Sequence, residues 1–182
     1  MTSLKRGAPA TTAYTEIRFV NLLDTPLRLS GTLEFTADGS LRKQVQTPYA
    51  ETTSIAGGQV TIERRGKPAR RFALKRAPEL AGFLESFIAV LSGDAPRLQQ
   101  SYTLQSSGDA RSWQLRLTPK DRALAKHVAN VEIDGRANEP RCFRIQEADG
   151  DLSVLLVDAL AAAKLIEPIT REALVTLCRA AP

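Results

Sequence analysis

The feature that most constrains this sequence is an alternation of apolar and polar residues with a period of two, interrupted repeatedly by turn sequences. In residues 27–36, every second position is apolar or glycine, and the positions between them are polar or charged. Such alternation is typical of a β-strand with one face against a core and the other toward water. Asp38-Gly39 follows at once and is typical of a tight hairpin turn. The sequence therefore predicts an antiparallel sheet.

Shorter runs of the same kind continue along most of the chain. A loosely spaced first strand contains Ile17, Phe19 and Leu22. Further strands are predicted at residues 41–46, 51–55, 60–62, 72–74, 98–105, 113–118, 128–134, 142–147 and 152–157. The clearest turns between them are Gly57-Gly58, Asp134-Gly135 and Asp149-Gly150-Asp151. About ten or eleven short strands with frequent turns favour a sandwich or barrel over alternating strands and helices.

The period changes in residues 78–92, where apolar residues recur at steps of three and four. This spacing is typical of a helix with one apolar face, and Pro78 and Gly93 suit its first position and its C-terminal cap. A helical turn is predicted at residues 121–126. Residues 159–182 form a helical tail that is interrupted at Pro168. We interpret residues 1–182 as a single domain whose first 13 residues are flexible.

Composition and charge exclude few classes of protein by themselves. The chain is 43% apolar and carries a net charge of +5, and no apolar run approaches the roughly 18 residues that a membrane span needs. Basic residues cluster only in residues 64–71, around Gly66, where a solvated hairpin tip explains them. Nucleic-acid binding is not expected, because aromatic residues make up 5% of the chain and most lie on predicted apolar faces.

No constellation of residues points to catalysis. His127 is the only histidine, so any catalytic pair or triad would have to use it, and a partly exposed strand residue is the simpler interpretation. Asp149 and Asp151 flank Gly150 but lack the other oxygen ligands of a calcium loop, and a hairpin turn explains both. We therefore expect no enzymatic activity, no metal site and no cofactor.

The remaining clue to function is the shape of the predicted fold, because the apolar face of a sheet must be covered by other elements. The predicted covers are the helix at 78–92 and the helical tail. If they leave space, an apolar cavity results and binds apolar ligands; if they pack down, the interior is solid and the same residues are core. The candidate cavity residues on the sheet are Leu29, Leu33, Phe35, Val45, Ile62, Phe72, Leu74, Trp113 and Leu115. The candidates on the covering helix are Phe83, Leu84, Phe87 and Leu91.

The order of these elements, from about Phe19 to Val157, resembles the outer-membrane lipoprotein carrier (LolA-type) family, and more closely its LolA-related branch. The similar pieces are Leu33-Glu34-Phe35, Thr47-Pro48, residues 56–62, the helix at 78–91, residues 98–104, residues 113–120 and Gly150-Asp151. The resemblance implies an unclosed β-barrel with a helical lid over an apolar cavity. It also implies a periplasmic carrier of lipid-modified protein or lipid, with a removed signal peptide, membrane-bound donor and acceptor proteins, and no cofactor. We expect a monomer.

The sequence also departs from typical members of that family. They carry an Arg-Pro pair after the second strand, where this chain has Thr36-Ala37-Asp38-Gly39, and they begin with a long amphipathic helix. Three alternatives therefore stay open. The cargo could be a lipid or acyl intermediate other than a lipoprotein. The fold could serve as a periplasmic binding or sensor module that regulates a partner protein. The chain could also be a cytosolic β-protein without a ligand.

Two cysteines, Cys142 and Cys178, occur without a metal-binding spacing. Two buried thiols and one disulfide are both compatible with the sequence. We predict a disulfide that ties the tail helix to the sheet.

Overall fold

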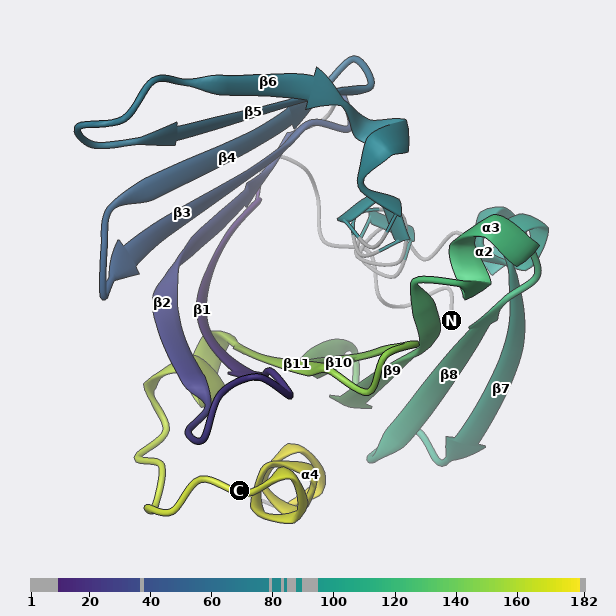
Figure 1. Cartoon of the computed structure of the whole chain (residues 1–182). Coiled ribbons are helices and arrows are strands. Elements are labelled where there is room, and N and C mark those ends of the chain that lie inside the picture. The colour runs from purple at the N-terminus through teal and green to yellow at the C-terminus, as the bar shows by residue number, and fades with distance from the viewer. Residues whose placement is uncertain are drawn as a thin grey trace.

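The computed structural model describes residues 10–36, 38–78, 80–82, 84, 88–89 and 95–180. Its strands form one antiparallel sheet of eleven strands in the order β6-β5-β4-β3-β2-β1-β11-β10-β9-β8-β7. Figure 1 shows the sheet curving strongly, so that its edges β6 and β7 lie on either side of an opening. The predicted class, a mainly antiparallel unclosed barrel with a few helices, is confirmed. The strands are β1 (Ala10–Phe19), β2 (Leu27–Phe35), β3 (Leu41–Thr47), β4 (Glu51–Ala56), β5 (Gln59–Arg64), β6 (Arg70–Ala73), β7 (Tyr102–Gly108), β8 (Trp113–Pro119), β9 (Val128–Arg136), β10 (Glu139–Glu147) and β11 (Leu152–Val157).

β1 lies in the middle of this sheet. The chain meanders from β1 outward to β6, crosses to the opposite edge, and meanders from β7 back to β11, which pairs with β1 from Tyr14 opposite Val157 to Phe19 opposite Leu152. The described helical residues of this connection are η1 (Leu74–Arg76), residues 78, 80–82, 84, 88 and 89, and α2 (Ala95–Ser101), and together they are called the crossing segment. The first and last strands therefore form the seam between two meanders.

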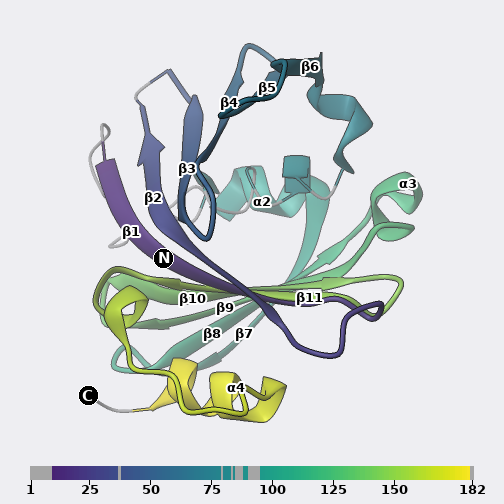
Figure 2. The ribbon, with the colours of Figure 1, turned by 60° about the vertical axis from the view of Figure 1, so that its left-hand side comes forward.

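The remaining helices are short and have defined caps. In α3 (Arg122–Ala125), the Asp121 carboxylate accepts hydrogen bonds from the backbone amides of Ala123 and Leu124. After η2 (Asp158–Ala162), the chain reaches α4 (Arg171–Arg179), whose first turn is capped by the Thr170 hydroxyl. Figure 2 shows α4 and α2 on opposite sides of the sheet.

Two apolar clusters cover the two faces of the sheet. The inner cluster joins sheet residues such as Leu33 and Ile133 to Leu84, Ile88 and Leu98 of the crossing segment. The outer cluster consists of the buried residues Ile17, Cys142, Leu152, Val154, Leu156, Leu160, Leu174 and Cys178. Every residue of β11 is buried because this strand is covered on both faces. The prediction that the tail helix helps to cover the inner face is wrong, since α4 packs on the outer face.

The structure corrects several predicted boundaries near the ends of strands. Residues 10–13 belong to β1 rather than to a flexible arm, and Leu22 is 93% exposed in the following loop rather than part of the strand. Buried polar residues on both faces of this central strand, such as Thr12, Thr15 and Glu16, hide its alternation in the sequence. Residues 98–101 are helical because α2 runs to Ser101, and Leu74 begins η1 instead of extending β6.

β9 continues through Gly135, where a turn is predicted. A Cβ atom at this glycine would lie 1.9 Å from the ring of Trp113, which is its partner on β8. The glycine therefore provides room for an indole that packs flat on the strand, and the turn falls at Ala137, which has a positive φ of 48°.

Cys142 of β10 and Cys178 of α4 are joined by a disulfide with a Cα–Cα distance of 5.7 Å, the pairing proposed from the sequence. Polar contacts support the same junction. The Arg179 guanidinium lies 3.4 Å from the Asp134 carboxylate, and Arg141 donates a hydrogen bond of 2.6 Å to the carbonyl oxygen of Ala180. The C-terminal helix is thus fixed to the outer face covalently and electrostatically.

We expect the double substitution Cys142→Ala/Cys178→Ala to lower the free energy of unfolding by about 4 kcal/mol, because the disulfide closes a loop with a sequence separation of 36 residues. Urea denaturation of the oxidised protein and the variant measures this difference. The wild-type protein unfolded with a reductant present controls for the lost side-chain atoms. Equal free energies in all three samples would show that the bond adds no stability.

We expect Gly135→Ala to destabilise the protein by about 1–3 kcal/mol, because the new methyl group overlaps the Trp113 ring. Combining it with Trp113→Ala removes the overlap, so the double variant should lose less stability than the sum of the two single variants. A double-mutant cycle from urea unfolding measures this coupling. Strict additivity would contradict the proposed contact.

Candidate ligand-binding site

A cavity of about 240 Å³ lies on the concave side of the sheet. The strands β1 to β5, β10 and β11 supply most of its wall, and Leu80 of the crossing segment closes part of it. Three of the candidate residues predicted from the sequence, Leu29, Val45 and Ile62, line it. The full lining is Glu16, Arg18, Leu29, Lys43, Val45, Tyr49, Glu51, Thr53, Ile62, Leu80, Ile145, Glu147, Ser153 and Leu155.

The other predicted candidates lie elsewhere. Leu33, Phe35, Leu84 and Leu115 are buried in the inner core, where the crossing segment packs against the sheet. Phe72, Leu74 and Trp113 are partly buried at the periphery of that core, and the indole nitrogen of Trp113 donates a 2.9 Å hydrogen bond to the carbonyl oxygen of Ala137. Phe83, Phe87 and Leu91 lie outside the described residues.

The concave side is therefore largely occupied by the protein's own side chains. Leu84, Ile88, Ala89 and Leu98 are buried there against the sheet. Cavities that enclose a drug-sized ligand usually measure about 300–1,000 Å³. The remaining 240 Å³ is smaller. The described side chains therefore leave less space on the concave side than a long hydrocarbon chain needs.

The wall of the cavity also carries charge, which sequence analysis missed. Glu16 is buried on β1 and forms ion pairs with Lys43 of β3 and, at 3.7 Å, with Arg18. The signal is visible in hindsight, because Lys43 stands between Leu41 and Val45 with a period of two and so faces inward with them. The register thus places both Glu16 and Lys43 inside, although charged side chains more commonly lie on the solvent face of a strand.

Tyr14 completes this charged cluster. The Lys43 ammonium lies 5.1 Å from the centre of the Tyr14 ring, and the phenol donates a long hydrogen bond of 3.5 Å to the carbonyl oxygen of Gln44. Burial raises the pKa of Tyr14 above its ordinary value, and the negative charge of Glu16 adds to that rise. The phenol is therefore neutral at physiological pH and acts as a hydrogen-bond donor.

The loop between β1 and β2 presents large apolar side chains to solvent. Leu22, Leu23 and Leu27 are exposed. Two hydrogen bonds from Asn21 hold the loop to the β10–β11 turn. The backbone N–H of Asn21 donates to the Asp151 carboxylate at 2.8 Å, and the Asn21 side-chain nitrogen donates to the carbonyl oxygen of Asp149 at 2.8 Å. The two strands that this loop joins carry Arg18 and Leu29 of the cavity wall.

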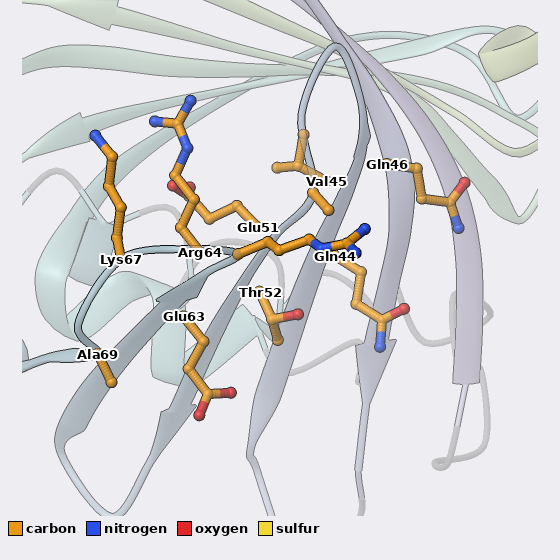
Figure 3. A pocket seen from close by; sticks show the side chains of 11 residues that line it. Gln44, Val45, Gln46, Glu51, Thr52, Glu63, Arg64, Lys67 and Ala69 are labelled. Carbon is orange, nitrogen blue, oxygen red and sulfur yellow. The ribbon is translucent and has the colours of Figure 1, made fainter.

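A second hollow of about 660 Å³ lies at the rim of β3 to β6 and shares Val45 and Glu51 with the cavity. Figure 3 shows Arg64 and Lys67 on one side of it, with Glu63 and Thr52 pointing the opposite way. The Arg64 guanidinium stacks 3.9 Å over the Tyr49 ring. Because this hollow is lined mainly by polar and charged side chains, it does not suit a hydrocarbon chain.

The described residues contain no group of three or more His, Cys, Asp and Glu side chains placed to bind a metal ion. None of the helices within the described ranges is both long and apolar enough to cross a membrane. His127 is exposed after α3, and its carbonyl oxygen accepts a 2.9 Å hydrogen bond from Ala148.

Strand order, curvature and an internal cavity together define an unclosed β-barrel of a type used for binding. A family model described as outer membrane lipoprotein carrier protein LolA-like matches residues 1–181. The chain therefore belongs to this LolA-like family, which confirms the resemblance noted in the sequence. The match includes the helical tail, beyond the stretch on which that resemblance was based.

The solved structures that match this chain are distant in sequence. A LolA superfamily protein from Nitrosomonas europaea is 10% identical over 94% of each chain, with a TM-score of 0.42. MucB is 15% identical over 91% of this chain and 58% of its own, with a TM-score of 0.42. LprF from Mycobacterium bovis is 10% identical over 87% of this chain and 89% of its own, with a TM-score of 0.35. This chain spans a little over half the length of MucB, and no curated protein matches the sequence.

The crossing segment is tied to the sheet by a specific buried contact. The Tyr102 hydroxyl at the start of β7 donates a hydrogen bond of 3.3 Å to the carbonyl oxygen of Gly82. We expect Tyr102→Phe to cost about 1 kcal/mol, because the carbonyl loses this buried donor. Hydrogen exchange should then speed up in peptides that contain Gly82 and Leu84 more than in peptides from β10. Tyr49→Phe at the rim is the matched control, and equal exchange in both variants would contradict this anchoring role.

Proposed function

We propose that this protein is a periplasmic, non-enzymatic carrier that shields acyl chains of a lipid-modified protein or lipid and transfers them between membrane-associated proteins. Membership of the LolA-like family supports this proposal. The observation that carries it is the apolar concave face, which is covered by a crossing segment and retains a cavity of about 240 Å³ next to that segment.

The physical reason for such a carrier is the cost of exposing hydrocarbon to water, roughly 0.8 kcal/mol for each CH₂ group. On the concave face, an acyl chain can replace the contacts that Leu84, Ile88 and Leu98 make with the sheet. The exchange trades one apolar contact for another, so binding has moderate affinity and release remains easy. Moderate affinity is what transfer to an acceptor requires.

The closed interior favours a second candidate, a periplasmic binding or sensor module that regulates a partner protein. If the crossing segment stays in place, the concave side offers little space, and the exposed Leu22, Leu23 and Leu27 become the main apolar contact surface. A stable complex with one protein, formed equally by delipidated and lipid-loaded samples, would favour this candidate over a carrier.

The carrier proposal predicts that a bulky residue in the cavity blocks acyl-chain binding. Ile62→Trp should weaken binding of a fluorescent fatty-acid probe about tenfold, because the larger side chain projects into a cavity of only about 240 Å³ and competes with the acyl chain for space. Glu63→Trp places the same indole on the exposed outer side of β5 and is the matched control.

Titration of both variants and the wild-type protein with the probe, together with native mass spectrometry of protein purified from periplasm, tests the proposal. Wild-type protein that carries no lipid and binds no probe would rule the carrier function out. Equal probe binding by Ile62→Trp and wild type would show that the chain binds outside this cavity.

A further inference from the structure

The charged cluster in the cavity wall indicates which cargo suits this site. Resting on the proposed carrier function, we infer that the cavity selects a single-chain amphiphile with a zwitterionic head group, one that presents both a cation and an anion, over an anionic one of equal chain length. The inference rests on the ion pair between Glu16 and Lys43. A cavity that only shields hydrocarbon from water does not need such a pair.

Apolar residues of the cavity wall flank the ion pair. Leu29 of β2 and Leu155 of β11 stand directly opposite Glu16 on its two neighbouring strands, and both are buried. The charged side chains become more exposed from Glu16 at 9% to Lys43 at 23% and Arg18 at 45%. An amphiphile whose tail lies against the apolar wall residues places its head group at Glu16 and Lys43.

Stability alone does not account for a charged pair at this position. Removing two charges from water is costly, and replacing such a pair with well-packed apolar residues is often neutral or stabilising. Val45, an inward neighbour of Lys43 on β3, lines the same cavity and shows that apolar residues fit this wall. The pair is therefore best explained by polar recognition of a ligand.

The balance of charge determines the kind of head group. The cavity wall carries three carboxylates, Glu16, Glu51 and Glu147, against two cations, Lys43 and Arg18. A net anion that contacts Lys43 also lies next to Glu16, the ion-pair partner of Lys43, and is repelled by this and the other carboxylates of the wall. A head group with an ammonium and a phosphate replaces the Glu16–Lys43 pair by two new pairs, ammonium with Glu16 and Lys43 with phosphate. The zwitterion thereby leaves both Glu16 and Lys43 with an oppositely charged partner.

The experiment compares lysophosphatidylethanolamine with lysophosphatidylglycerol of the same acyl chain, below their micelle concentrations, as competitors of the fluorescent fatty-acid probe. Wild-type protein should bind the ethanolamine lipid about tenfold more tightly, the effect of one additional charge-assisted contact. Glu16→Gln should abolish or reverse this ratio, since it removes the partner of the ammonium and makes the wall less negative. Glu63→Gln changes the net charge equally on the outer side of β5 and should leave the ratio unchanged.

A long-chain alcohol without a charged head serves as a third competitor. If neither the alcohol nor either lysolipid displaces the probe from wild-type protein, the carrier function itself fails. If the alcohol displaces it but the two lysolipids compete equally, the carrier function stands and the head-group inference is overturned. Should Glu16→Gln fail to fold, Glu16→Gln/Lys43→Gln removes the pair without leaving a lone charge. That variant should bind the alcohol as wild type does and lose the lysolipid preference, and a retained preference would likewise overturn the inference.

Discussion

The pairing of β1 with β11 is the interaction on which the rest of this structure depends. These strands are the first and last of the sheet in sequence, and six residue pairs from Tyr14–Val157 to Phe19–Leu152 join the two meanders. Apolar side chains cover this seam on both faces, from the crossing segment inside and from η2 and α4 outside. The Thr15 hydroxyl adds a 2.7 Å hydrogen bond to the carbonyl oxygen of Ala161. Without the seam, the two halves would each be an open sheet with one exposed apolar face.

The outer cover lets the inner face serve a ligand. Burial of Ile17, Val154 and Leu156 under α4 stabilises the centre of the sheet independently of what occupies the concave side. The buried Arg144 reinforces this region, because it pairs with Glu132 at 2.7 Å and with Asp134 at 2.8 Å. Contacts on the inner face can therefore be exchanged while the scaffold keeps its shape.

Much of the sheet could be predicted from sequence because most of its strands have one apolar face and one polar face. β2 is the clearest case, and its boundaries differ from the prediction by a single residue. Prediction was weakest where buried polar residues hide the alternation, as in β1, or where a tertiary contact overrides a local signal, as at Gly135 beneath Trp113. The candidate site was predicted only in its apolar part. Leu29, Val45 and Ile62 follow from alternation, whereas Glu16 and Lys43 require knowledge of which face of each strand turns inward.

The path of the chain between the two sheet edges has a mechanical consequence. β6 and β7 are the two edges of the sheet, and the chain that links them includes η1, the helical residues 78, 80–82, 84, 88 and 89, and α2. Leu84, Ile88 and Leu98 of this connection also fill the concave side. The separation of the two edges and the occupancy of the concave side are therefore coupled through one stretch of chain, while the covered centre of the sheet stays in place.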